Sequence, residues 1–268
     1  MLCDYHVHST YCDGKSTLRE NVEAAIKYGM DVIGFSGHSF IEGSNYCMSK
    51  RGIADYTAEI SLLKKEYKDK IAILSGLEKD YYSSDNEAGF DYVIGSLHFV
   101  TDGTKLYDVD HTPAITRGII DNVFHGDEMS YCEAYFSTLE KLFDNVKADI
   151  IGHFDLINKF AEKGIEFDTK SSRYISACTD ALDALLPHNV PFEINTGAMS
   201  RGHRSVPYPS PEVLKYIREK GGSIIFNSDS HDAKNLCYGF DIARELAMQC
   251  GFKSRIIITP NGKKEIDL

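Results

Sequence analysis

Leu2-Cys3-Asp4-Tyr5-His6-Val7-His8 is a short apolar run that ends on two histidines, and Thr17-Leu18-Arg19-Glu20 follows it after a polar loop. An apolar run of this length is typical of a buried strand in a parallel sheet. Thr17 and Glu20 have capping-box spacing, and apolar residues continue from them at helical intervals through Ile26. This opening stretch therefore predicts one strand, one loop and one helix, in that order.

The same pattern recurs along the chain. Eight runs have strand character: residues 2–6, 31–36, 71–77, 92–96, 149–152, 191–195, 223–227 and 255–259. Helical patterns cover residues 18–26, 56–67, 129–145, 172–189 and 239–250, and a further helix begins at Ser210-Pro211-Glu212. About eight strands that alternate with helices favour a closed barrel over an open doubly wound sheet. No linker composition divides the chain, so we expect one domain over residues 1–268.

The composition disfavours several classes of protein. The chain has 268 residues, of which 43% are hydrophobic and 26% charged, as in an ordinary soluble protein with a sizeable core. Its net charge of -11 disfavours binding to nucleic acid or to an anionic membrane. No apolar run approaches the ~20 residues that span a bilayer, and the first strand leaves no room for a secretory leader. We therefore expect a cytoplasmic protein with a small-molecule partner; the sequence does not indicate its oligomeric state.

Metal-ligating side chains gather just beyond the predicted strands. Nine of them occupy such positions: His6, His8, Asp13, His38, Glu78, His98, His153, Asp229 and His231. Because the C-terminal ends of parallel barrel strands open on one face, we expect these side chains to converge at one mouth. Taken singly, each is more often a hydrogen-bonded core histidine or a solvated acid. Together they favour more than one Zn²⁺, Mn²⁺ or Fe ion, since each such ion takes about four to six ligands.

The motifs that carry these residues resemble those of the polymerase and histidinol phosphatase (PHP) superfamily, in the right order from residue 4 to about residue 260. They are Asp4-Tyr5-His6-Val7-His8-Ser9 with Asp13-Gly14, Gly37-His38-Ser39, Gly76-Leu77-Glu78, Gly95-Ser96-Leu97-His98, Gly152-His153 and Ser228-Asp229-Ser230-His231. Chain length, Glu193-Ile194-Asn195-Thr196-Gly197 and Tyr208-Pro209-Ser210-Pro211 look most like the monofunctional histidinol-phosphate phosphatases of that superfamily. The resemblance implies an α/β fold, a distorted (β/α)7 TIM-like barrel with a metal site at the C-terminal ends of its strands.

The resemblance also implies three divalent metal ions, which are Zn, Mn or Fe. Carried over residue by residue, it places His6, His8, Glu78 and Asp229 on one ion, Asp13, His38 and His231 on a second, and Glu78, His98 and His153 on a third. Many relatives have a histidine at the position of Asp13. An oxygen ligand there shifts the preference of the second site toward Mn or Fe without excluding Zn.

The implied reaction is hydrolysis of L-histidinol phosphate to L-histidinol and phosphate, a step of histidine biosynthesis. We expect a hydroxide that bridges two of the ions to attack phosphorus in line, and Asp229 or His231 to handle the proton that reaches the leaving alkoxide. Arg201 and Arg204, which follow the sixth strand, and Lys159 are candidate phosphate ligands. The ammonium and imidazole of the substrate require an acid near the mouth, and Glu42, Asp80, Asp155 and Glu193 are equally placed candidates.

Two other functions fit the same motifs. The first is a PHP phosphoesterase that acts on another small phosphate or on a phosphotyrosyl protein. The second is a polymerase-accessory or structural metal-binding PHP module, which the negative charge and the complete set of ligands disfavour. A thiolate nucleophile at Cys12 is also disfavoured, because no phosphate-cradling C-x5-R loop accompanies it.

Overall fold

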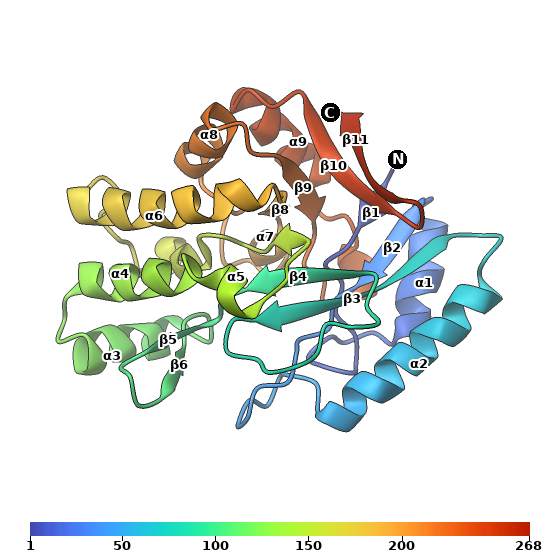
Figure 1. Ribbon diagram of the computed structural model, residues 1–268, viewed down its shortest axis with the longest axis horizontal. Coiled ribbons are helices and arrows are strands. Elements are labelled where there is room, and N and C mark those ends of the chain that lie inside the picture. The colour runs from blue at the N-terminus through green and yellow to red at the C-terminus, as the bar shows by residue number, and fades with distance from the viewer.

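A computed structural model describes residues 1–268, and seven parallel strands form its nearly closed barrel (Figure 1). In sheet order they are β1 (Cys3–Asp4), β2 (Val32–Phe35), β3 (Ala72–Asp80), β4 (Tyr92–Ser96), β7 (Ile150–Ile151), β8 (Phe192–Asn195) and β9 (Ile224–Asn227). Every neighbouring pair in this order is parallel. The distorted seven-stranded barrel that the resemblance implied is therefore confirmed.

The seam of the barrel lies between the extensions of β1 and β9. The backbone N–H of His8 donates to the carbonyl of Ser230 at 2.8 Å, and the N–H of Ser230 donates to the carbonyl of His6 at 2.9 Å. The first and last barrel strands thus meet at predicted metal-ligating residues.

Helices cover the outside of the barrel (Figure 1). They are α1 (Leu18–Lys27), α2 (Lys50–Glu66), α3 (Pro113–Val123), α4 (Glu128–Leu139), α5 (Leu142–Asn145), α6 (Ser172–Leu185), α7 (Gly197–Ser200), α8 (Pro211–Glu219) and α9 (Phe240–Gln249). Short 3-10 turns occupy Leu156–Asn158, Ala161–Lys163, Leu186–His188 and Ala233–Asn235. The capping box at the start of α1 is present: the Thr17 N–H donates to the Glu20 carboxylate at 2.7 Å, and the Glu20 N–H donates to the Thr17 hydroxyl at 3.2 Å. No helix combines the length and the apolar character needed to cross a membrane.

The eighth predicted strand does not join the barrel, so the count of eight was wrong. β10 (Ser254–Thr259) pairs antiparallel with β11 (Gly262–Asp267) in a hairpin outside the barrel. The turn between Thr259 and Gly262 returns the chain too soon for a parallel crossover, which needs a dozen or more residues. Two predicted helices are also shorter than expected: the pattern over 129–145 breaks between α4 and α5, and α6 ends in a 3-10 turn that contains Pro187.

An insertion after β4 is present that the sequence did not predict. It contains the antiparallel hairpin of β5 (Phe99–Thr101) and β6 (Leu106–Asp108), followed by α3. Its strands have three residues each, which is too short for a clear alternating pattern.

The barrel interior is filled in layers that set the floor of the site. Tyr92 is 1% exposed, and its hydroxyl donates to the carbonyls of Tyr5 at 2.5 Å and Phe35 at 2.9 Å. A Cβ at Gly76 would lie 2.2 Å from the Tyr92 ring, so only glycine leaves room for that ring. Two residues further along β3, on the same face of the strand, is Glu78. The aromatic floor therefore lies directly below this carboxylate.

Candidate metal centre

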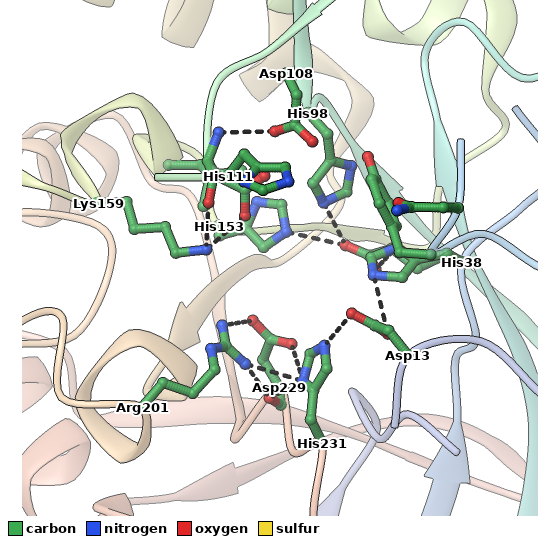
Figure 2. Close-up of a pocket in the computed structure, with 15 residues that line it drawn as sticks. Asp13, His38, His98, Asp108, His111, His153, Lys159, Arg201, Asp229 and His231 are labelled. Atoms are coloured by element: carbon green, nitrogen blue, oxygen red, sulfur yellow. Dashed lines mark hydrogen bonds and ion pairs between the residues drawn. The ribbon is translucent and has the colours of Figure 1, made fainter. Parts of the chain in front are cut away.

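The predicted ligands meet at a cavity of about 270 Å³ at the C-terminal ends of the barrel strands (Figure 2). Seven of the nine line it: Asp13, His38, Glu78, His98, His153, Asp229 and His231. His6 and His8 lie beneath them with no exposed surface. Asp13 and His231 lie at the rim, with 34% and 18% of their side chains exposed. The structure thus brings all nine residues together from both ends of the chain.

Glu78 is at the centre of the group and is 1% exposed. Its Oε1 lies 2.9 Å from Nε2 of His153 and 3.3 Å from Nε2 of His98. Its Oε2 lies 2.8 Å from Nδ1 of His38 and 3.2 Å from Nε2 of His6. One carboxylate therefore faces imidazoles from four different strand ends, as a bridging ligand must.

Four sets of donor atoms are close enough to hold an ion each. Within each set the atoms lie within 4.8 Å of one another, and the sets are His8, Asp13, His38 and His231; His6, Glu78 and His153; His6, His8 and Asp229; and His38, Glu78 and His98. These sets use the nine predicted residues and no others. They differ from the carried-over assignment in three ways: His8 joins the second group, Glu78 is not in the set of His6, His8 and Asp229, and the expected third group is divided, with His153 beside His6 and His98 beside His38.

The chemistry of these sets fits divalent transition metals. Nitrogen and carboxylate oxygen donors suit Zn, Mn and Fe. Three of the donor atoms, His6 Nε2, His8 Nε2 and Glu78 Oε2, are buried without a hydrogen-bond partner. Buried polar atoms rarely lack a hydrogen-bond partner, so these three unpaired ligand atoms indicate coordination to a cation.

The buried charges shift the pKa values of these residues in both directions. Although burial opposes it, neighbouring carboxylates raise the pKa values of His6, His38 and His98, so metal binding there displaces protons. Burial, followed by the positive charges of His231 and His38, lowers the pKa of His8 to about 3, so its imidazole is neutral. Burial opposes ionisation of Glu78, but the surrounding imidazoles, His6 first, hold the pKa of its carboxyl well below the usual range. Neutral imidazole and ionised carboxylate are the forms that bind metal.

A carboxylate outside the ligand sets orients His98. Asp80 is 4% exposed, and its Oδ2 accepts the backbone N–H of His98 at 2.8 Å and lies 3.1 Å from Nδ1 of the same residue. This leaves Nε2 of His98 facing Glu78. Such carboxylate-histidine contacts fix the tautomer of a metal-ligating imidazole.

Two of the three predicted phosphate ligands line the cavity. Arg201 donates from Nη1 to the Asp229 carbonyl at 2.9 Å and from Nη2 to the Asp229 carboxylate at 3.0 Å. Lys159 donates to the Asp110 carboxylate at 2.7 Å. Arg204 is not among the lining residues, and its guanidinium lies 4.5 Å above the ring of Tyr208.

The wall opposite Arg201 is acidic, and sequence reasoning missed it. Figure 2 shows Asp108 and His111 on the side of the cavity away from Arg201 and His231. Asp108 ends β6 and accepts the backbone N–H of Asp110 at 2.9 Å. Burial and the neighbouring Asp110 raise the pKa of Asp108 above its usual range. The only sequence signal was an Asp-x-Asp pair after a three-residue strand.

None of the four acids proposed from sequence for the cationic end of the substrate lines the cavity. Glu42 is exposed elsewhere on the surface. Asp80, Asp155 and Glu193 are at most 4% exposed and accept hydrogen bonds inside the protein. Asp80 ends β3 and Glu193 lies within β8, and each carboxylate contacts a histidine of the centre. Asp155 follows β7 and is held by the backbone N–H of Ser210.

Comparisons with known proteins identify the family of the chain. The family model of the PHP domain matches residues 4–197. Histidinol-phosphatase from Bacillus subtilis is 27% identical over 266 residues, covering 89% of this chain and 96% of the relative, and that from Lactococcus lactis subsp. lactis is 28% identical over 263 residues, covering 93% and 91%. A solved structure of histidinol phosphate phosphatase from Lactococcus lactis subsp. lactis, complexed with zinc, L-histidinol and phosphate, matches with a TM-score of 0.74 and 24% identity over 98% of both chains.

Proposed function

Because the chain belongs to the PHP family, we propose that it is a phosphomonoesterase that hydrolyses L-histidinol phosphate to L-histidinol and phosphate, with residues 1–268 acting as one barrel domain. The observation that carries this proposal is the convergence of nine candidate metal ligands, with Glu78 at their centre. The histidinol-phosphatases of similar length support the choice of substrate.

We assign three divalent ions, Zn, Mn or Fe, to this centre, since its four candidate sets overlap through His6, His8, His38 and Glu78. Such ions ionise water near neutral pH and neutralise the oxygens of a phosphoryl group during in-line displacement. The zinc, L-histidinol and phosphate of the Lactococcus lactis structure support this assignment.

The remaining groups of the cavity bind and orient the phosphate. Arg201 presents a planar guanidinium that can hold two phosphoryl oxygens, and Lys159 adds a second positive charge on the same cavity. Hydrolysis breaks the ester P–O bond and adds water, so the leaving alcohol oxygen must gain a proton. We assign the handling of that proton to Asp229 or His231, which lie 3.5 Å apart at the cavity. Arg204, held on Tyr208, is a weaker candidate for phosphate.

The acidic wall fits the other end of the substrate. L-histidinol phosphate carries an ammonium and an imidazole on its alcohol portion. Asp108 lines the cavity across from Arg201, whereas Asp110 is paired with Lys159. We assign Asp108 to the cationic end of the substrate, because a carboxylate there accepts charge-assisted hydrogen bonds.

The test is phosphate release from L-histidinol phosphate, compared with p-nitrophenyl phosphate, a nucleoside monophosphate and a phosphotyrosyl peptide, on protein loaded in turn with Mn²⁺, Fe²⁺ or Zn²⁺. We expect kcat/KM for L-histidinol phosphate to exceed the others by about 10²-fold or more, since a polar site rejects analogues that leave its groups unpaired. Preference for the peptide or the nucleotide would instead favour another branch of the family. Absence of turnover on all four substrates would count against an enzymatic role.

A further inference from the structure

Glu193 connects four barrel strands just below the metal centre and is itself not in any ligand set. It is fully buried on β8. Its Oε1 lies 2.6 Å from Nδ1 of His6 and accepts from the side-chain amide of Asn227 at 2.8 Å. Its Oε2 accepts from the backbone N–H of His153 at 2.8 Å and from the side-chain amide of Asn195 at 2.9 Å. All four partners are donors or, for His6, a ring nitrogen that can donate.

This contact decides which nitrogen of His6 carries the proton. Three N–H groups donate to the two oxygens of Glu193, so this carboxylate is an acceptor on both sides. Nδ1 of His6, 2.6 Å from Oε1, is therefore the ring nitrogen that presents a proton to it. Nε2 is then the ring nitrogen that faces the other ligand atoms, 3.2 Å from Oε2 of Glu78 and 3.8 Å from Oδ1 of Asp229.

Glu193 contacts two candidate metal ligands, through the ring of His6 and the backbone N–H of His153. Both residues belong to one ligand set. His6, Glu78 and His153 form that set, and Glu193 fixes the ring of one member and the backbone of another. His6 is also in the set with His8 and Asp229, but only the first set contains both groups that Glu193 holds. No hydrogen bond or ion pair joins Glu193 to the rim set of His8, Asp13, His38 and His231.

We propose that Glu193 is a positioning residue of the metal centre, which sets the affinity of the His6, Glu78 and His153 set by holding His6 in the form with its proton on Nδ1. This inference rests on the metal centre of the proposed function. Carboxylates in this outer position typically change metal affinity by about 10–100-fold when they are replaced.

Glu193→Gln is the informative variant, because it keeps the size of the side chain and removes half of its acceptors. Glutamine offers one oxygen and one NH2 group, so its amide nitrogen must face two N–H donors in either orientation. Asp155→Asn is the matched control. Asp155 is also fully buried just after a neighbouring strand and accepts the Ser210 N–H at 2.9 Å, but it contacts no ligand ring.

The experiment measures bound metal on folded protein. Wild type, Glu193→Gln, Asp155→Asn and Asp13→Asn are loaded with Zn²⁺, dialysed against increasing chelator, and their ions counted by mass spectrometry. In Glu193→Gln we expect one ion to bind about 10–100-fold more weakly. The ion whose binding Asp13→Asn weakens should stay bound to Glu193→Gln as tightly as to wild type. Asp155→Asn should bind every ion as wild type does. If Glu193→Gln weakened the binding of every ion equally, or weakened the binding of no ion, the inference would be overturned.

A double-variant comparison separates positioning from general loosening of the barrel. If Glu193 acts through His6, then adding Glu193→Gln to His6→Ala should change zinc affinity by less than about three-fold beyond His6→Ala alone. Additive losses would contradict the inference. Failure of the wild type itself to retain zinc would overturn the proposed function as well, whereas normal retention by wild type and Glu193→Gln alike would overturn only the role of Glu193.

Discussion

Arg201 donates from Nη2 to Oδ2 of Asp229 at 3.0 Å, so the main candidate for binding phosphate is in direct contact with a candidate metal ligand. Burial opposes ionisation of Asp229, but Arg201 holds the pKa of its carboxyl well below the usual range. The contact fixes the guanidinium at the cavity wall before substrate arrives.

Replacing Arg201 should therefore slow hydrolysis strongly. We expect Arg201→Lys to lower kcat/KM by about 10²-fold, because lysine keeps the charge but cannot grip two oxygens in a plane. Steady-state phosphate release measures this change in kcat/KM. Arg204→Ala is the comparison, since that side chain lies on Tyr208 and not on the cavity, and its loss should be about ten-fold smaller. Equal losses of kcat/KM in the two variants would indicate that both arginines bind the phosphate.

Replacing Glu78 or His153 should remove the metal centre. Glu78→Ala deprives two ligand sets of a shared member, and His153→Ala deprives one. We expect each to lose bound metal and about 10³-fold or more in kcat, with the far-ultraviolet circular dichroism spectrum unchanged. Full activity in both variants would be incompatible with a centre built on these residues.

Asp108→Asn should alter substrate choice more than the hydrolytic step. We expect KM for L-histidinol phosphate to rise about ten-fold, and KM for p-nitrophenyl phosphate to stay within about two-fold, because only the first substrate carries a cation on its alcohol portion. Asp121→Asn, an exposed acid on α3, is the control for net charge. A similar rise for both substrates would remove Asp108 from the recognition of the cation.

The buried carboxyl of Asp155 should make stability depend on pH. Burial raises its pKa in the folded protein above the unfolded value near 3.9, so folding retains a proton that the unfolded chain releases. As pH rises from about 4 through the folded pKa, wild type should lose stability relative to Asp155→Asn. Thermal unfolding of both metal-free proteins between pH 4 and 7 measures this difference. A difference that stays constant over the range would mean that Asp155 titrates normally.

The floor of the barrel should not tolerate a methyl group at Gly76. A Cβ there would lie 2.2 Å from the Tyr92 ring, so we expect Gly76→Ala to lower the free energy of unfolding by about 3 kcal/mol. Gly118→Ala in α3 is the control. Beyond its chain neighbours and the backbone of its own helix, a Cβ at Gly118 would have one neighbour within 4 Å, the Asn122 side-chain nitrogen at 3.9 Å, which is an ordinary contact distance. Alanine there should stabilise the helix by about 0.5–1 kcal/mol. Chemical denaturation of the three proteins gives both values.

The barrel strands and the candidate metal ligands could be predicted because a short local pattern in the sequence marks each of them. An apolar run followed by a histidine or acid reports both a strand and the residue at its C-terminal end, as at His38 and His153. Seven of the eight runs formed barrel strands. The run at 255–259 has the same composition, and only its return through the turn to Gly262 distinguishes it.

Side-chain direction could not be predicted for acids near the ends of strands. Glu193 follows the same kind of apolar pattern as Glu78, yet it faces the barrel interior below the cavity instead of its open space. Asp108 reaches the cavity on a hairpin of three-residue strands, whose pairing depends on contacts with distant residues. Both outcomes depend on tertiary packing that no short window of sequence contains.

The seam of the barrel has a consequence for how the chain holds itself together. His6 and His8 lie at the start of the chain, and Asp229 and His231 lie more than two hundred positions later, with two backbone hydrogen bonds joining the segments between them. An ion bound by His6, His8 and Asp229 would therefore be a cross-link that closes a loop of more than two hundred residues, as a disulfide would. Unlike a disulfide, it is reversible by chelation, which ties the durability of the closed barrel to the supply of metal.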